Sequence, residues 1–137
     1  MLKPLHHGIS VPDADASIRW YGDLFGFRVK SDEFVPPLNA RIVFLENDCF
    51  QLELFQYMGG DGKPVPPERF NPDEDLKTGG TKHVAYAVED LAGLYATLCE
   101  KQVTVVKPPF PMNGDMVCFI RDNADILLEL IEVGGAR

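Results

Sequence analysis

The sequence predicts an α+β fold in which one structural unit is written twice. A strand, a helix and three further strands are expected in residues 1–57, and the same order is expected again in residues 81–137. Each half contains a carboxylate within an apolar run, Glu53 in LELF and Glu129 in LELI. The 137 residues are about one domain in length, so we expect a single domain made of two βαβββ modules.

The first module starts with the run HHGISV, in which alternation places His7, Ile9 and Val11 on one face of a strand. Pro12 ends this strand and Asp13 is suited to cap a helix. Apolar side chains at helical spacing and a closing glycine predict that helix over residues 14–25. Three strands are then expected at residues 27–34, 40–46 and 49–57.

Residues 58–80 are rich in glycine and proline and show almost no apolar periodicity. Loops of this length in a small domain are usually functional or act as linkers. The position between the modules favours a linker. A lid is the alternative, because Arg69 and Phe70 lie within the loop.

The second module repeats the pattern. His83, Ala85 and Ala87 alternate with Tyr86 and its neighbours, so the Tyr86 hydroxyl is expected to face away from His83. Glu89-Asp90 opens a helix, and Pro108-Pro109 is expected to end the strand that follows it. The three strands after the helix are expected at residues 103–106, 116–120 and 126–133.

Each module alone would be a small curved sheet with exposed edges and one helix. Pairing two such sheets buries more surface, so we expect a mixed half-barrel whose concave faces meet at a shared cleft. The modules can pair within one chain or between two chains.

Composition restricts the class of protein. The net charge is −8 and the pI is about 4.7, so neither nucleic acid nor an anionic membrane surface is an expected partner. An odd number of cysteines, Cys49, Cys99 and Cys118, predicts buried, reduced thiols rather than a disulfide framework. There is no N-terminal apolar targeting segment and no run of membrane-spanning length, so a cytoplasmic protein is expected.

The repeated glutamates suggest a metal site. A carboxylate within a buried strand is unfavourable unless it is paired, protonated or bound to a metal. Glu53 and Glu129 alternate away from their neighbouring leucines, which places both on the concave side. The 76 residues between them also separate His7 from His83.

These two histidines and two glutamates would offer two nitrogen and two oxygen donors on rigid strands. Such a set admits Fe, Mn, Co, Ni, Zn or Mg. His6 is the competing histidine, but it lies on the other face from His7, and its counterpart 76 residues later is Lys82. The interval therefore favours His7 as the ligand.

The stretches HHGISVPDADASIRWYGDLFGF, FQLELF, TKHVAYAVEDL and CFIRDNADILLEL resemble the vicinal oxygen chelate superfamily, also called the glyoxalase/bleomycin-resistance/dioxygenase superfamily. The resemblance covers nearly the whole chain except residues 58–80. It implies paired βαβββ modules, a divalent metal in the cleft and a homodimer. Its metal ligands would be His7, Glu53, His83 and Glu129.

The resemblance also implies a small-molecule substrate with two neighbouring oxygens that chelates the metal. In glyoxalase I and methylmalonyl-CoA epimerase, a glutamate at the metal moves a proton next to a carbonyl. A lyase, isomerase or epimerase that works through an enolate is therefore expected, with Glu129, Glu53 or both carrying the proton.

Three alternatives stay open. An extradiol Fe(II) ring-cleaving dioxygenase would need two histidines and one glutamate, which His7, His83 and Glu129 supply. A metal-free antibiotic-binding resistance protein would lack the four ligands, and a metal-dependent antibiotic-modifying transferase would keep them. Glutathione is not the expected substrate carrier, because Val11 stands four residues after His7, where glyoxalase I has an arginine, and LFQYMGG lacks the ending Tyr-Asn-Trp-Gly.

Overall fold

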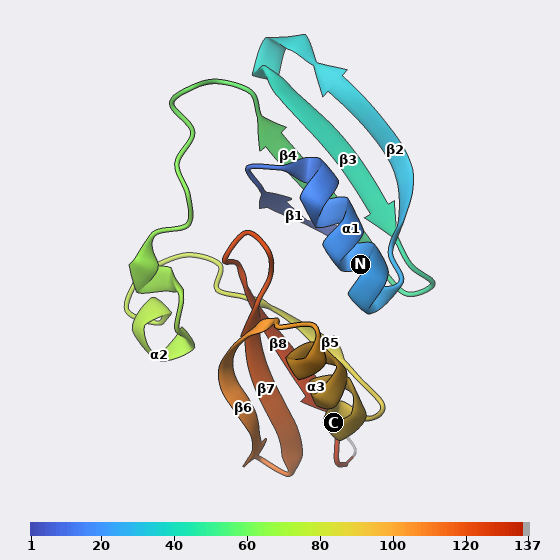
Figure 1. Cartoon of the computed structure of the whole chain (residues 1–137), viewed down its shortest axis with the longest axis vertical. Coiled ribbons are helices and arrows are strands. Elements are labelled where there is room, and N and C mark those ends of the chain that lie inside the picture. The colour runs from blue at the N-terminus through green and yellow to red at the C-terminus, as the bar shows by residue number, and fades with distance from the viewer. Residues whose placement is uncertain (136–137) are drawn as a thin grey trace. The chain divides into compact units, whose positions relative to one another are not determined.

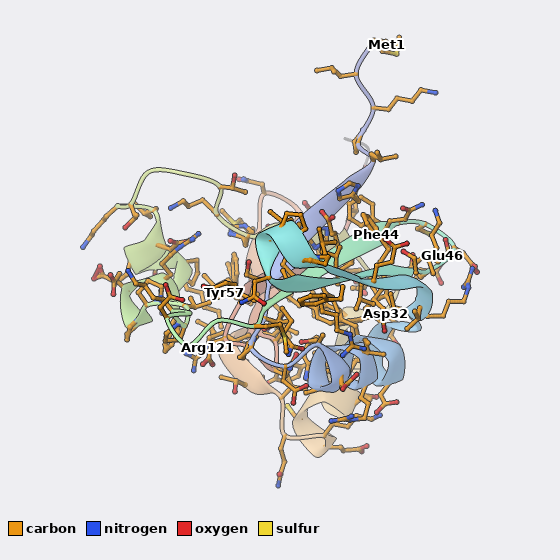
Figure 2. All side chains as sticks on the ribbon, turned by 90° about the horizontal axis from the view of Figure 1, so that it is seen from above. Met1, Asp32, Phe44, Glu46, Tyr57 and Arg121 are labelled. Atoms are coloured by element: carbon orange, nitrogen blue, oxygen red, sulfur yellow. The ribbon has the colours of Figure 1, made fainter. Side chains whose placement is uncertain are left out.

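The computed structural model describes residues 1–135 as two compact units, Met1–Pro64 and a second that begins at Val65. Figure 1 shows that each unit consists of one sheet with a helix lying across it. Each unit is described below by itself. In the first, Met1 and the residues after it extend away from the sheet, and the Met1 side chain is fully exposed (Figure 2).

The first unit has the order strand, helix and three strands. Its elements are β1 (His6–Ser10), α1 (Ala14–Phe25), β2 (Arg28–Val35), the short 3-10 helix η1 (Pro36–Leu38), β3 (Ala40–Glu46) and β4 (Gln51–Tyr57).

The second unit repeats this order after two short helical turns. Its elements are the 3-10 helix η2 (Pro67–Arg69), α2 (Pro72–Asp75), β5 (Val84–Ala87), α3 (Leu91–Glu100), β6 (Thr104–Met112), β7 (Asp115–Arg121) and β8 (Leu127–Glu132).

Both sheets have the same topology. The strand order is β1-β4-β3-β2 in the first and β5-β8-β7-β6 in the second, and in each the first strand is parallel to its neighbour while the other pairs are antiparallel. A strand that pairs in parallel with the last strand of its own module leaves room for the helix to cross one face. The predicted α+β class with a repeated βαβββ module is confirmed.

One face of each sheet packs against its helix. In the first unit, β3 and β4 bury Val43, Leu45, Leu52 and Leu54 fully, and Tyr21 of α1 is fully buried with them. In the second unit, fully buried side chains from α3, β7 and β8 play the same part: Leu98, Cys118, Ile120, Leu128 and Leu130. Because strand residues alternate, Glu53 and Glu129 project from the opposite, helix-free face.

The two helices begin in the same way. The Asp13 carboxylate accepts from the Ala16 amide of α1 at 3.1 Å, and the Asp90 carboxylate accepts from the Gly93 amide of α3 at 3.0 Å. These contacts satisfy amides that the first helical turn leaves without partners, as the sequence predicted for both aspartates.

A second side chain, from the last strand of each sheet, completes each helix start. Gln56 Oε1 accepts from the Ala14 amide at 2.7 Å, and Glu132 Oε1 accepts from the Leu91 amide at 2.9 Å. These two contacts tie each helix to the sheet that it covers.

Strand β6 is longer than the sequence indicated. It runs through Pro108 and Pro109 to Met112, although the two prolines were expected to end it near Val106. Its pairing with β7 is irregular between Val105 and Phe110. A proline donates no amide hydrogen, but β6 is an edge strand and bulges there, so the strand continues past both prolines.

Two further expectations are corrected in the structure. Residues from Val65 onward belong to the second unit and contain η2 and α2, so much of the 58–80 stretch is folded. Of the three free cysteines only Cys118 is buried, because Cys49 lies in the turn before β4 and Cys99 lies on the outer side of α3. Among the described residues, no helix is long and apolar enough to cross a membrane.

Candidate metal-binding site

In the first unit, a histidine and a glutamate meet on the helix-free face of the sheet. His6 Nε2 lies 3.2 Å from Glu53 Oε1, and the side chains are 30% and 18% exposed. Strand pairing places Gly8 beside Glu53, and the absence of a side chain there leaves space next to the carboxylate. The Phe44 ring packs edge-on against the His6 imidazole, with ring centroids 5.2 Å apart.

The second unit contains a matching set. His83 Nε2 lies 3.2 Å from Glu129 Oε1, with side chains 25% and 15% exposed. Phe119 packs edge-on against His83, again with ring centroids 5.2 Å apart. Phe44 lies opposite Glu53 in the first sheet, and Phe119 lies opposite Glu129 in the second. The two sets therefore share residue types, register and distances.

This match identifies His6, not His7, as the counterpart of His83. Glu53 lies beside Gly8, and Glu129 lies beside Ala85, so the residues two positions earlier are His6 and His83. The expectation that His7 shares a face with Glu53 is wrong, because neighbouring residues in a strand point to opposite faces.

His7 lies on the helix side of the first sheet. Its ring stacks on Phe50, with centroids 5.1 Å apart and an interplanar angle of 21°. Burial, reinforced by the neighbouring His6, lowers the pKa of His7 to about 4, so this imidazole is neutral at physiological pH. His7 is thus a packing residue in this structure.

A sequence signal for His6 does exist. Asp13 and Asp90, which cap the two helices, are 77 residues apart, and the same interval relates His6 to His83. The interval becomes 75 for Phe44 and Phe119 and 76 for the two glutamates, because the segments between strands differ in length. An alignment anchored on the helix caps, rather than on the glutamates, selects His6.

The donor chemistry of the two pairs fits a divalent cation. An imidazole nitrogen and a carboxylate oxygen at 3.2 Å, on a sheet face away from the packed core, are donors that such a cation accepts without a thiolate. Within either unit, among residues 1–135, no third His, Cys, Asp or Glu side chain joins a pair to form a cluster able to hold a metal. A complete four-donor shell would therefore need both pairs.

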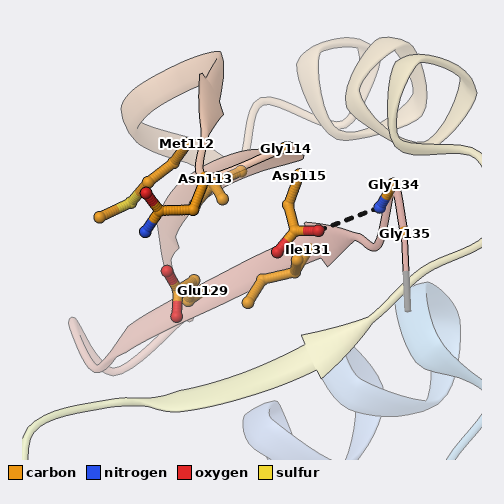
Figure 3. Close-up of a pocket in the computed structure, with 9 residues that line it drawn as sticks. Met112, Asn113, Gly114, Asp115, Glu129, Ile131, Gly134 and Gly135 are labelled. Atoms are coloured by element: carbon orange, nitrogen blue, oxygen red, sulfur yellow. Dashed lines mark hydrogen bonds between the residues drawn. The ribbon is translucent and has the colours of Figure 1, made fainter. Parts of the chain in front are cut away.

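A cavity of about 640 Å³ opens beside Glu129 in the second unit (Figure 3). Val117 and Ile131 line its apolar wall and pack together with Phe119. The hairpin turn between β6 and β7 forms one rim, where Asp115 Oδ1 accepts from the Gly134 amide at 3.0 Å. The sequence analysis did not find this cavity, since its lining joins residues from three segments of the chain.

A duplicated βαβββ module, with one His/Glu pair on the same face of each sheet, defines the class of α+β protein to which this molecule belongs. The family model described as "Glyoxalase/Bleomycin resistance protein/Dioxygenase superfamily" matches residues 3–130. The chain belongs to that superfamily, as the resemblance of its motifs predicted.

Individual relatives agree with the family. A probable lactoylglutathione lyase from Synechocystis sp. is 26% identical over 139 residues, which cover 97% of each chain. A glyoxalase family protein from Enterococcus faecalis superposes with a TM-score of 0.76 at 24% identity, over 95% of this chain and 97% of that one. Glyoxalase I from Zea mays superposes with a TM-score of 0.72 at 25% identity, over 96% of this chain and 45% of that one.

Proposed function

We propose that the protein is a divalent-metal-dependent lyase or isomerase that moves a proton on a carbon next to a carbonyl. The observation that carries this proposal is the matched pair of sets, His6 with Glu53 and His83 with Glu129, each at 3.2 Å. A single strand histidine beside a glutamate is a common packing contact. Two such contacts in equivalent registers of a repeated module support a shared chemical role.

In this proposal, His6 and His83 supply nitrogen donors and Glu53 and Glu129 supply oxygen donors to one cation. When bound, the cation would polarise a substrate carbonyl and lower the barrier to removing the neighbouring proton. We propose a homodimer, as is frequent in the superfamily, and the two units that complete the shell come from one chain or from two.

Glu129 is the proposed proton carrier. Its carboxylate lines the cavity, so a substrate held against the apolar wall of Val117 and Ile131 lies within reach of it. His83, 3.2 Å away, holds the carboxylate in place. Glu129 would take the proton from the carbon on one side of the carbonyl and return it to the neighbouring atom.

The proposed substrates are small metabolites with two neighbouring oxygens. The Synechocystis relative is named for a lactoyl thioester, in which a hydroxyl stands next to a carbonyl. With His6 as the ligand, the residue four positions later is Ser10 rather than Val11, and neither is the arginine of glyoxalase I. A carrier other than glutathione is therefore proposed.

The three histidines of the chain allow a direct test of the ligand set by NMR. Metal-free protein with ¹⁵N-labelled histidine is titrated with Zn²⁺, and the ring nitrogens are followed. We expect the Nε2 signals of His6 and His83 to shift together while those of His7 do not. A shift at His7 in place of His6, or no shift at any ring, would refute the proposed ligand set.

The reaction is tested separately. Metal-loaded protein is incubated in D₂O with a panel of small α-hydroxycarbonyl compounds, and deuterium incorporation next to the carbonyl is measured by NMR. We expect exchange with the wild type and none with the metal-free protein. Oxygen consumption with catechols, without such exchange, would instead establish a ring-cleaving dioxygenase.

A further inference from the structure

The two proposed histidine ligands are held by the backbone in different ways. His6 lies inside β1, where it pairs with Gln51 of the neighbouring strand. His83 lies one residue before β5, which begins at Val84. Its position therefore depends on the segment that leads into the strand.

That segment contains a buried charge. The Asp75 side chain, at the end of α2, is only 1% exposed, and its Oδ1 lies 2.8 Å from Arg69 Nε and 3.3 Å from Lys82 Nζ. A buried carboxylate is unfavourable without such partners. Arg69, the first cause, and Lys82 hold the pKa of Asp75 below its usual value, so the cluster is ionised at neutral pH.

The cluster of Arg69, Asp75 and Lys82 also holds the backbone immediately before His83. Arg69 Nη2 donates to the Thr81 carbonyl at 2.7 Å and lies 3.4 Å from the Lys82 carbonyl. Lys82 Nζ in turn donates to the carbonyls of Asp75 and Thr78. Both residues that precede His83 are thus fixed by hydrogen bonds to a single folded segment.

The same segment is attached to the sheet of the second unit at two further points. Asp73 Oδ1 accepts from Lys107 Nζ of β6 at 2.8 Å. The Arg121 guanidinium of β7 lies over the Phe70 ring, 4.3 Å from its centroid. The cluster is therefore referenced to the strands beside β8, which carries Glu129.

We propose that Asp75 is a positioning residue, which through Arg69 and Lys82 holds His83 where the strand ladder does not. The inference rests on the proposed function, since the purpose of this position is to present the imidazole with Glu129 to the metal. It assigns a role to a stretch that the sequence indicated only as a linker or a lid.

The test compares Zn²⁺ affinity with fold stability in the full-length protein. Asp75→Asn keeps the shape of the side chain but removes its charge. Asp73→Asn is the matched control, because it removes an exposed ion pair from the same short helix without touching the cluster. Metal affinity is measured by isothermal titration calorimetry, and stability by thermal unfolding of the metal-free forms.

We expect Asp75→Asn to weaken Zn²⁺ binding by about tenfold, as changes in residues that orient metal ligands commonly do. In the histidine NMR spectrum, the His83 ring signals of the metal-free variant should move while those of His6 do not. The Asp73→Asn control should bind Zn²⁺ like the wild type. If Asp75→Asn does not fold, Arg69→Lys serves instead, because one ammonium group cannot contact both Asp75 and the Thr81 carbonyl.

The possible failures can be told apart. A wild type that binds Zn²⁺ through His6 and His83, with a folded Asp75→Asn variant of unchanged affinity and unchanged His83 signals, would refute the positioning role alone. A wild type that binds no divalent metal would refute the proposed function and this inference with it. A lower melting temperature with unchanged affinity would reduce Asp75 to a structural residue.

Discussion

Replacing His7 and His6 separately by alanine distinguishes a packing role from a metal-binding role. The His7 ring is half-buried and stacks on Phe50. Such a ring pair contributes about 0.5–1.5 kcal/mol beyond burial, and the lost apolar contacts add about 1 kcal/mol. We therefore expect His7→Ala to lower the free energy of unfolding of the metal-free protein by about 2 kcal/mol.

For a chain of this size, that loss corresponds to a melting temperature lower by about 6 °C. His6→Ala removes a partly exposed contact with Glu53, which contributes less than about 1 kcal/mol. Its metal-free form should therefore melt close to the wild type. The two variants should rank in the opposite order for bound metal, because only His6 faces Glu53.

The assay combines calorimetric melting of metal-free protein with elemental analysis after loading and desalting. The metal-free state is needed because a ligand that binds only the folded state raises its stability. His7→Phe is the control that keeps the stacked ring but removes both ring nitrogens, and it should retain metal. Metal retained by His6→Ala and lost from both His7 variants would overturn the assignment.

Three further predictions concern single positions. Glu129→Gln should bind Zn²⁺ within about tenfold of the wild type but lose deuterium exchange, and wild-type exchange would remove Glu129 as the proton carrier. Burial raises the pKa of the Cys118 thiol to about 11, so the native chain should react with a thiol reagent at its two exposed cysteines and at all three once unfolded. Because the unfolded thiol loses its proton first, stability should fall between about pH 9 and 11, and Cys118→Ala should remove that part of the fall. Gly8→Ala would place a Cβ 3.1 Å from the Phe55 ring and 3.4 Å from Glu53 Oε1, so it should weaken metal binding more than it lowers the melting temperature, whereas an equal affinity would show that the neighbouring groups move aside.

The sequence predicted the repeated module because local signals agree with one another. The aspartate caps, the helical spacing of apolar residues and the alternation in LELF and LELI each depend only on neighbours along the chain. Such signals persist in the folded state, and both glutamates lie on the helix-free faces that alternation assigns to them.

Predictions that depended on pairing between strands were less successful. The prolines of β6 were taken as a strand end, but an edge position and irregular pairing accommodate them. The segment that contains Asp75 lacks apolar periodicity, and its order comes from ion pairs and carbonyl contacts distant in sequence.

The sequence by itself determined that this chain is a duplicated βαβββ protein with a histidine and a glutamate in each half. Only the tertiary structure decided which of two adjacent histidines faces the glutamate. Consecutive strand residues point to opposite faces, so a shift of one residue in the pairing of β1 with β4 exchanges His6 for His7. That register is set by contacts across the sheet, which no interval along the chain specifies.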